Sequence, residues 1–177
     1  MKNRIIALAI ATVAVFSANS ASAQNTGNAW AYGKTKIVAG LQLAKTQDLQ
    51  FGQIVRSAIA GTVTLDAASA NRVAAGGVTI GQNAGNTSAR FTATGEPGYL
   101  YSLTLPTTPV ALTKTVTSGT APTMNVTNFT STLGSSAIGT LGTDGTQIFS
   151  VGGTLNIGAS QETGEYQGQF NVTVTYQ

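Results

Sequence analysis

The chain has 177 residues, with nine Lys and Arg, six Asp and Glu, and neither His nor Cys. Without His and Cys it cannot form a Ser-His-Asp triad, a thiol nucleophile, a zinc finger or a disulfide. Charged residues make up only 8% of the sequence, against about 25% in ordinary soluble domains, which excludes a basic nucleic-acid binder and an acidic disordered tail. The remaining composition, rich in Thr, Gly, Ala, Ser, Asn and Val, favours an exported β-protein with an uncharged surface.

The first 23 residues have the pattern of a secretory signal peptide. Lys2 and Arg4 supply the positive start, an apolar run covers 5–16, and small residues at 21–23 form a cleavage site. The apolar run is too short for a bilayer span, which needs about 20 residues. The pattern predicts export through the Sec pathway and a mature chain that begins at Gln24.

The mature chain is long enough for one domain with a hydrophobic core, and no linker or second domain stands out. We divide the sequence into the signal peptide at 1–23, an N-terminal extension at 24–36 and a β-domain at 37–177. Two of the nine basic residues lie in the signal peptide, so the mature chain is nearly neutral and its composition does not indicate nucleic-acid binding.

Apolar and polar residues alternate along most of the mature chain, with the two-residue period of strands that bury one face. The expected strands, in chain order, cover 37–43, 49–55, 62–65, 78–80, 89–93, 99–105, 124–129, 153–157 and 169–176. Turn residues separate these runs, and 67–75 is expected to form a loop. Short alternating strands at this spacing predict a single all-β fold, an immunoglobulin-like antiparallel β-sandwich.

Glycines inside two of these runs predict irregular backbone. Gly52 interrupts 49–55, and Gly152-Gly153 precedes a regular strand, which indicates a β-bulge or a close strand crossing. The glycine pairs Gly76-Gly77 and Gly152-Gly153 both lack the Lys-Ser/Thr and the helix of a phosphate-binding loop.

The six carboxylates are scattered and predict no catalytic or metal site. Glu162 and Glu165 are three positions apart, but no cluster of polar or aromatic residues accompanies them. Asp144-Gly145 lacks the carboxylate density of a calcium loop. We therefore expect no enzyme activity, no cofactor and no bound metal.

Trp30 and Tyr32 stand out because large aromatic residues are unusual in a solvated terminal segment. They alternate with small residues at 29, 31 and 33, which is typical of a strand. Two pairings fit such a strand: one within its own domain, and one with another molecule.

The C-terminal sequence resembles the end of pilus subunits assembled by the chaperone–usher pathway. Those subunits end in an alternating strand with a penultimate Tyr, here Tyr176, and a Gly fourteen residues from the C-terminus, here Gly164. The segment 49–54 resembles their early strand, although this chain lacks the disulfide that many of them carry. The mature chain is also similar to an uncharacterised family of exported Gram-negative proteins with the landmarks L-x-F-G, G-T-V, G-G-V, V-G-G-T-L and G-x-Y-x-G-x-F-x-V-T-V-x-Y.

This resemblance implies a pilin-like sandwich that is one strand short and is completed in trans. A periplasmic chaperone lends a strand to the last strand and holds the terminal carboxylate of Gln177. At an outer-membrane usher the N-terminal extension of the next subunit, with Trp30 and Tyr32, replaces the chaperone strand. The implied acceptor edge carries Gly164, Phe170, Val172, Val174 and Tyr176.

The leading hypothesis is therefore a structural subunit of a cell-surface fibre that supports adhesion or biofilm formation. Its partners are copies of itself or related subunits, and no nucleic acid. The second hypothesis is an autonomous secreted surface or coat protein with a complete sandwich. The third is a small carbohydrate-binding module that uses Tyr99 and Tyr101, although these residues more commonly pack in a core.

Overall fold

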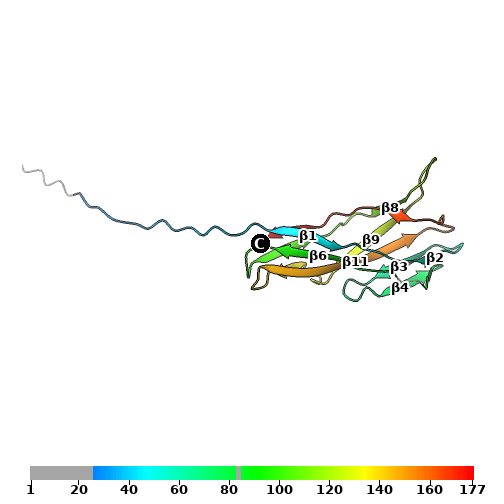
Figure 1. Cartoon of the computed structure of the whole chain (residues 1–177), viewed down its shortest axis with the longest axis horizontal. Coiled ribbons are helices and arrows are strands. Elements are labelled where there is room, and N and C mark those ends of the chain that lie inside the picture. Colours follow the sequence, from blue (N-terminus) through cyan, green and yellow to red (C-terminus); the bar gives the residue numbers. More distant parts are fainter. Residues whose placement is uncertain (1–25, 83–84) are drawn as a thin grey trace, which may run out of the picture. The chain divides into compact units, whose positions relative to one another are not determined.

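The computed structural model describes residues 26–82 and 85–177, and these form an all-β fold (Figure 1), as the sequence predicts. None of the described residues belongs to a helix long and apolar enough to cross a membrane. The predicted signal peptide at 1–23 lies outside the described residues. In chain order the strands are β1 (Gln42–Gln47), β2 (Ile54–Val55), β3 (Gly61–Leu65), β4 (Arg72–Gly76), β5 (Thr79–Ile80), β6 (Ala89–Thr94), β7 (Leu100–Thr104), β8 (Val110–Lys114), β9 (Thr123–Ser131), β10 (Ile138–Thr140), β11 (Thr146–Ile157), β12 (Tyr166–Gln167) and β13 (Thr173–Tyr176).

The chain divides into two units, Met1–Lys36 and Ile37–Gln177. In the described part of the first unit, residues 26–36 carry no regular secondary structure. The alternating pattern around Trp30 and Tyr32 predicts a strand, and the structure corrects this expectation. A strand requires a neighbouring strand to pair with, and residues 26–36 take part in no strand pairing among the described residues.

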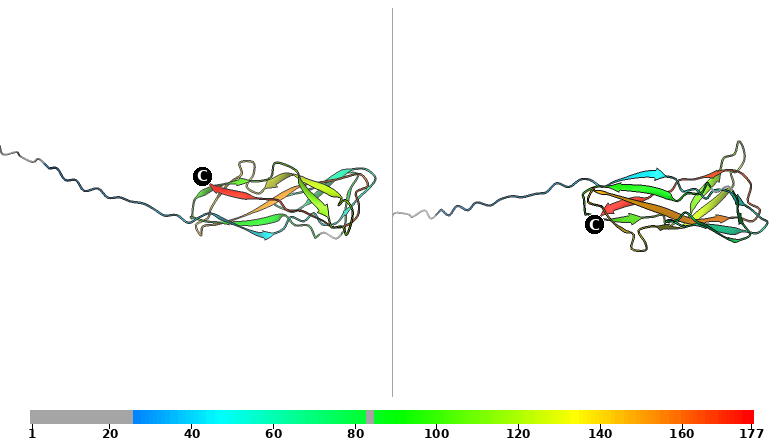
Figure 2. Two further views of the ribbon diagram at one scale, coloured as in Figure 1. Left: turned by 90° about the horizontal axis from the view of Figure 1, so that it is seen from above. Right: turned by 60° about the horizontal axis from the view of Figure 1, so that its bottom comes forward.

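The second unit is an antiparallel β-sandwich. Its larger sheet has the order β1-β6-β11-β9-β8-β12, and β3 pairs with both β11 and β4. A second sheet has the order β10-β7-β13, and β2 pairs with β5. Figure 2 shows β1, in cyan, and β13, in red, in different layers.

The longest strand, β11, changes partner along one of its edges. Its first half pairs with β6 and its second half with β3. Gly152 lies at the changeover, where a Cβ would approach Leu65 O to 2.2 Å. On the other edge, the register with β9 shifts between Gly152 and Thr154, across from Asn128, whose φ is +48°. This confirms the irregularity predicted at Gly152-Gly153 and explains why the first of these residues must be glycine.

The core consists of two clusters of buried side chains. The first packs β6 and β11 against β7, and within it Phe91 and Phe149, paired across the two strands, stack with ring centroids 5.5 Å apart. The second cluster contains Phe51, Val63, Leu65, Val78, Val126, Leu155 and Ile157. Each such side chain stabilises the fold by about 1.5–3 kcal/mol when fully buried, and the chain has no disulfide to add to this packing.

Several strand expectations need correction. The strand expected at 37–43 begins only at β1, the one expected at 49–55 is reduced to β2, and the one expected at 169–176 is reduced to β13. The residues that drop out alternate correctly but belong to no continuous ladder among the described residues, and only Gln50 makes an isolated bridge, with Thr87. Conversely, the expected loop at 67–75 contains most of β4, an Ala- and Gly-rich strand that forms because it pairs with β3.

Candidate functional site

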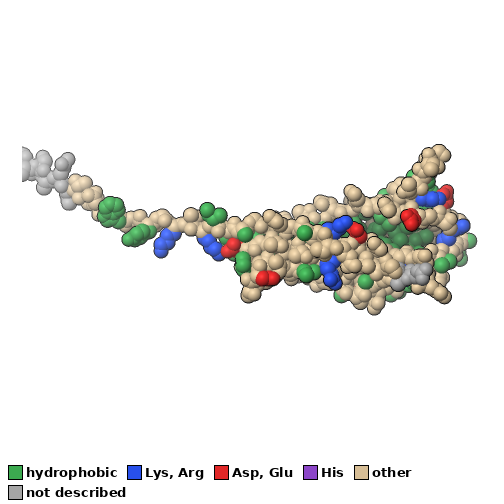
Figure 3. Space-filling model, viewed as in Figure 1, with side chains coloured by type: hydrophobic (Ala, Val, Ile, Leu, Met, Phe, Trp, Pro, Cys, Tyr) green, Lys and Arg blue, Asp and Glu red, His purple; other side chains and the backbone are tan. Residues whose placement is uncertain are grey.

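A groove runs between a segment near the start of the sandwich domain and a segment near its end. It encloses about 1280 Å³, and a smaller recess of about 340 Å³ adjoins it. We call the two together the edge groove. Figure 3 shows hydrophobic side chains at the bottom of a hollow in this part of the molecule, with acidic and basic side chains around it. The two parts of the edge groove share the lining residues Lys45, Asp48, Leu49, Gly168, Gln169 and Phe170.

The first wall of the groove is the segment 45–56, which includes the chain between β1 and β2. An isolated bridge ties this segment to the larger sheet through Gln50 and Thr87, with N–H···O distances of 2.8 and 2.9 Å. Gly52 follows with a φ of +66°, a conformation that glycine adopts without strain. Most of this wall is thus extended chain that is held by hydrogen bonds from Thr87, Gly81 and Arg72 and belongs to no long strand.

Arg72 of β4 anchors the first wall from behind. Its guanidinium donates hydrogen bonds to the backbone oxygens of Phe51 and Gln53, at 2.9 and 3.0 Å. A third, longer bond of 3.4 Å reaches Gly81 O. Sequence reasoning missed this residue, because its partners lie 19 and 21 positions away and no local pattern marks it.

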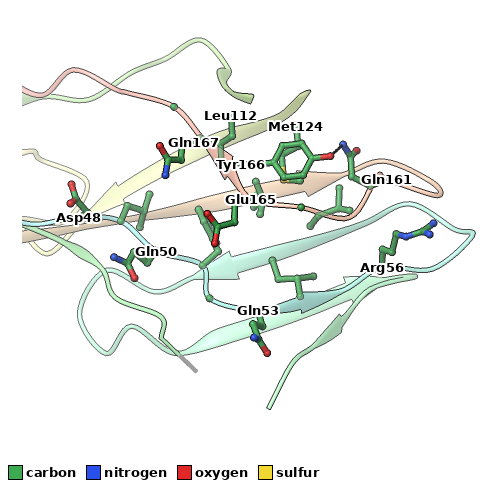
Figure 4. A pocket seen from close by; sticks show the side chains of 18 of the residues that line it. Asp48, Gln50, Gln53, Arg56, Leu112, Met124, Gln161, Glu165, Tyr166 and Gln167 are labelled. Atoms are coloured by element: carbon green, nitrogen blue, oxygen red, sulfur yellow. Dashed lines mark hydrogen bonds between the residues drawn. The ribbon is translucent and has the colours of Figure 1, made fainter. Parts of the chain in front are cut away.

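The second wall is the segment 161–170, which leads into β13. The Tyr166 hydroxyl accepts a hydrogen bond from Gln161 Nε2 at 2.9 Å and donates one to Glu162 O at 2.8 Å. Figure 4 shows the bond between Tyr166 and Gln161 at the end of this wall. After β12 the chain forms no strand until β13, and β13 pairs with β7 alone among the described residues. The other edge of β13 is therefore free to pair.

The floor of the groove is the hydrophobic core itself. Leu155 and Ile157 lie at its base, 4% and 5% exposed. Leu112, Met124 and Phe170 also line it but are only half-buried. Apolar side chains that pack on the core and face an open groove provide a site for another apolar segment. The segment 168–172 borders this floor and has no strand partner among the described residues, which provides the surroundings that an added β-strand requires.

The penultimate residue, Tyr176, closes the gap between the layers beyond the groove. Its hydroxyl accepts a hydrogen bond from Glu96 N–H at 2.7 Å and donates one to Ala39 O at 2.9 Å. Its ring meets Tyr99 edge-on, with centroids 5.6 Å apart. Here β1 and β13 are in contact. The last strand is thus tied to the chain that enters β1.

The predicted acceptor residues of the C-terminal strand share one face. Phe170 and Val172 line the edge groove, and Val174 and Tyr176 continue along β13. All four are half-buried against the first core cluster, whereas the residues between them are exposed. Phe170 also packs on Phe129, with ring centroids 5.0 Å apart.

The remaining predicted site residues lie apart from this face. Gly164 lines the groove with a φ of +147°. Gln177 is exposed, and its N–H donates to Leu100 O at 3.1 Å. Trp30 and Tyr32, in the first unit, are 97% and 92% exposed. The large aromatic side chains of the N-terminal extension are therefore available to a partner.

Tyr99 and Tyr101 do not form the aromatic surface that a sugar-binding module would need. Tyr101 is fully buried, and only Tyr99 reaches the surface. Burial raises the pKa of the Tyr101 hydroxyl to about 12. The structure thus corrects the expectation that this pair could serve as a platform.

The carboxylates are dispersed among local interactions. Within the described residues, no three acidic side chains are placed to hold a metal ion. Hydrogen bonds from the hydroxyl and then the amide of Thr146 lower the pKa of Asp144. Glu162 forms an ion pair with Lys114, at 3.0 Å. Asp144 and Glu162 thus take part in local interactions of turns and loops.

A family model described as a domain of unknown function (DUF4402) matches residues 41–176, so the chain belongs to this family. No curated protein matches the chain, and no solved structure does. The matched region covers all thirteen strands and both walls of the edge groove.

Proposed function

We propose that this member of the DUF4402 family is a structural subunit of a cell-surface fibre. In this proposal the edge groove of one copy receives the N-terminal extension of the next. The observation that carries the proposal is the groove itself, a gap floored by core residues and bordered at 168–172 by chain without a strand partner among the described residues. The same chain carries an extension with two exposed aromatic residues, Trp30 and Tyr32.

An inserted strand would form backbone hydrogen bonds along the groove and would cover its apolar floor. The segment 168–172, and beyond the groove the outer edge of β13, would offer N–H and C=O groups to a neighbouring strand. In an extended segment Trp30 and Tyr32 point to the same side, so both can face the floor. Complete burial of these two rings would supply much of the binding energy.

The partners follow from the resemblance to chaperone–usher pilus subunits. The groove would be filled first by a strand of a periplasmic chaperone, which would also hold the Gln177 carboxylate. An outer-membrane usher would then exchange that strand for the extension of the next copy. Export by the predicted signal peptide and a fibre at the cell surface are part of the same proposal.

The test uses Trp30, the one tryptophan in the sequence, as a fluorescent probe. We compare the chain that begins at Gln24 with a rearranged chain, in which residues 24–36 follow Gln177 through a flexible linker. The rearranged chain should be a monomer with blue-shifted tryptophan emission and a cooperative, higher-temperature melt. The unrearranged chain should form oligomers whose size grows with concentration. In the rearranged chain, Trp30→Ser with Tyr32→Ser should lower the melting temperature.

If the unrearranged chain is a stable monomer at every concentration, with residues 24–36 protected from protease, donor exchange is wrong. The protein would then be an autonomous surface or coat protein, with its extension paired to its own domain.

A further inference from the structure

One carboxylate in the edge groove has no partner within the described residues. Three acidic residues line the groove. Asp48 forms an ion pair with Lys45, and Glu162 forms one with Lys114. Glu165 makes no ion pair or hydrogen bond within the part of the chain that the structure describes. Figure 4 shows its side chain between the two walls, on the side toward Gln50 and Gln53.

The backbone around Glu165 is well fixed. Gly164 precedes it, where a Cβ would approach Lys114 Cε to 2.7 Å. Tyr166 follows it, pairs with β8 in the sheet and has its hydroxyl held by Gln161. The backbone next to Glu165 is therefore tied to β8, and its exposed carboxylate lies at the groove without an ion pair among the described residues.

The N-terminal extension carries a lysine, Lys34, two positions after Tyr32 and four after Trp30. In an extended strand, residues i, i+2 and i+4 share one face, so Lys34 points to the same side as Trp30 and Tyr32. Lys34 is exposed and makes no ion pair or hydrogen bond within the described residues. If the two aromatic rings face the groove floor, this ammonium group faces the groove as well. A cation brought into such a site needs an anionic partner.

We propose that Glu165 pairs with Lys34 of the incoming extension from a second copy, and that this pair sets the register of the inserted strand. The inference rests on the proposed function, since it names the contact that selects the donor segment. A slip of one residue would turn Lys34 to the opposite face and away from Glu165. Asp48 and Glu162 would have to break their ion pairs with Lys45 and Lys114 in order to pair with Lys34.

The experiment measures binding of a synthetic peptide with the sequence of residues 24–40. The acceptor is the full mature chain carrying Trp30→Ser and Tyr32→Ser, so the peptide supplies the one tryptophan in the mixture. Fluorescence titration gives Kd for the peptide and for its Lys34→Glu form. Each is titrated against three acceptors, one unchanged at the groove, one with Glu165→Lys and one with Glu162→Lys.

Glu165→Lys should weaken binding of the unaltered peptide by about tenfold or more, because an opposite-charge contact is replaced by a like-charge one. The Lys34→Glu peptide should recover most of that loss on the Glu165→Lys acceptor, because the exchanged charges pair again. Glu162→Lys is the matched control, with the same charge change three positions away. The Lys34→Glu peptide should not recover binding there.

The outcomes separate this inference from the proposed function. If the unaltered peptide binds but its Kd is the same with Glu165→Lys, or if recovery is equal for Glu162→Lys, the pair is wrong and donor insertion stands. If the unaltered peptide does not bind at all, the proposed function fails and this inference fails with it. Circular dichroism melts of the acceptors confirm that each is folded, as expected for substitutions at exposed positions.

Discussion

Tyr101 has a buried hydroxyl without a hydrogen-bond partner among the described residues. Its ring packs beside Phe149, with centroids 6.4 Å apart. An unsatisfied buried polar group costs about 1–3 kcal/mol. Tyr101→Phe should therefore raise the melting temperature, by about 2–4 °C per kcal/mol gained. Tyr166→Phe is the contrasting control, because it removes a hydroxyl with two hydrogen bonds and should lower the melting temperature.

The same variant has a defined pH dependence. Burial raises the pKa of Tyr101 to about 12, from an ordinary value of 10.0. The unfolded chain therefore loses this proton at lower pH than the folded chain, and the native state loses stability as pH rises from 10 toward 12. Melts across this window should show a smaller loss for Tyr101→Phe than for the unaltered chain. Equal slopes would mean that another group governs alkaline unfolding.

At the scale of elements, β11 depends on glycine at one position of its Gly152-Gly153 pair. A Cβ at Gly152 would meet backbone atoms, Leu65 O at 2.2 Å and Ala67 N at 2.7 Å. A Cβ at Gly153 would first meet the Val126 side chain, at 3.2 Å. Gly152→Ala should destabilise by about 1–3 kcal/mol or more, and Gly153→Ala by clearly less. Urea unfolding measures the difference, and equal shifts of the midpoint would contradict the partner change at Gly152.

The elements also show how far the sequence predicts this fold. Strands with strong alternation that lie between two neighbours, such as β6 and β9, follow directly from the pattern. Strands rich in Ala and Gly, such as β4, form through pairing with a neighbour and leave no clear local signal. The groove walls deviate in the opposite sense, because 49–53 and 169–172 alternate like strands and yet form no strand among the described residues, where 49–53 makes only one isolated bridge. The strand pattern and the observed structure disagree most at the candidate site. This is expected if the site is completed only when a strand of another molecule pairs with it.

The candidate site was predictable only in part. The C-terminal face of Phe170, Val172, Val174 and Tyr176 follows from a two-residue period, and the structure places all four on one half-buried side. The role of Arg72 could not be predicted, since its partners are distant in sequence. The sequence assigns Glu165 no functional role, because the carboxylates are scattered along it. Its position in the groove depends on how the loop before β12 folds against β8.

For the whole molecule, the proposal implies an open chain of copies. Each copy has one groove and one extension, and head-to-tail contacts that do not close produce a fibre. The Trp30→Ser and Tyr32→Ser variant should still accept an extension but should not donate one. Added in increasing amounts to the unaltered mature chain, it should progressively lower the mean oligomer mass in light scattering, because it occupies one end of each chain and stops growth there.

A matched control separates end-capping from simple dilution. The rearranged chain, whose own extension fills its groove, has neither a free groove nor a free donor and should leave the oligomer mass unchanged. A closed pair that exchanges extensions reciprocally would behave differently, because the unaltered chain would never exceed the mass of two copies. That result would retain donor insertion and exclude a fibre, since a reciprocal exchange satisfies both grooves at once. The mass of the unaltered chain at high concentration therefore decides between a closed pair and a fibre subunit.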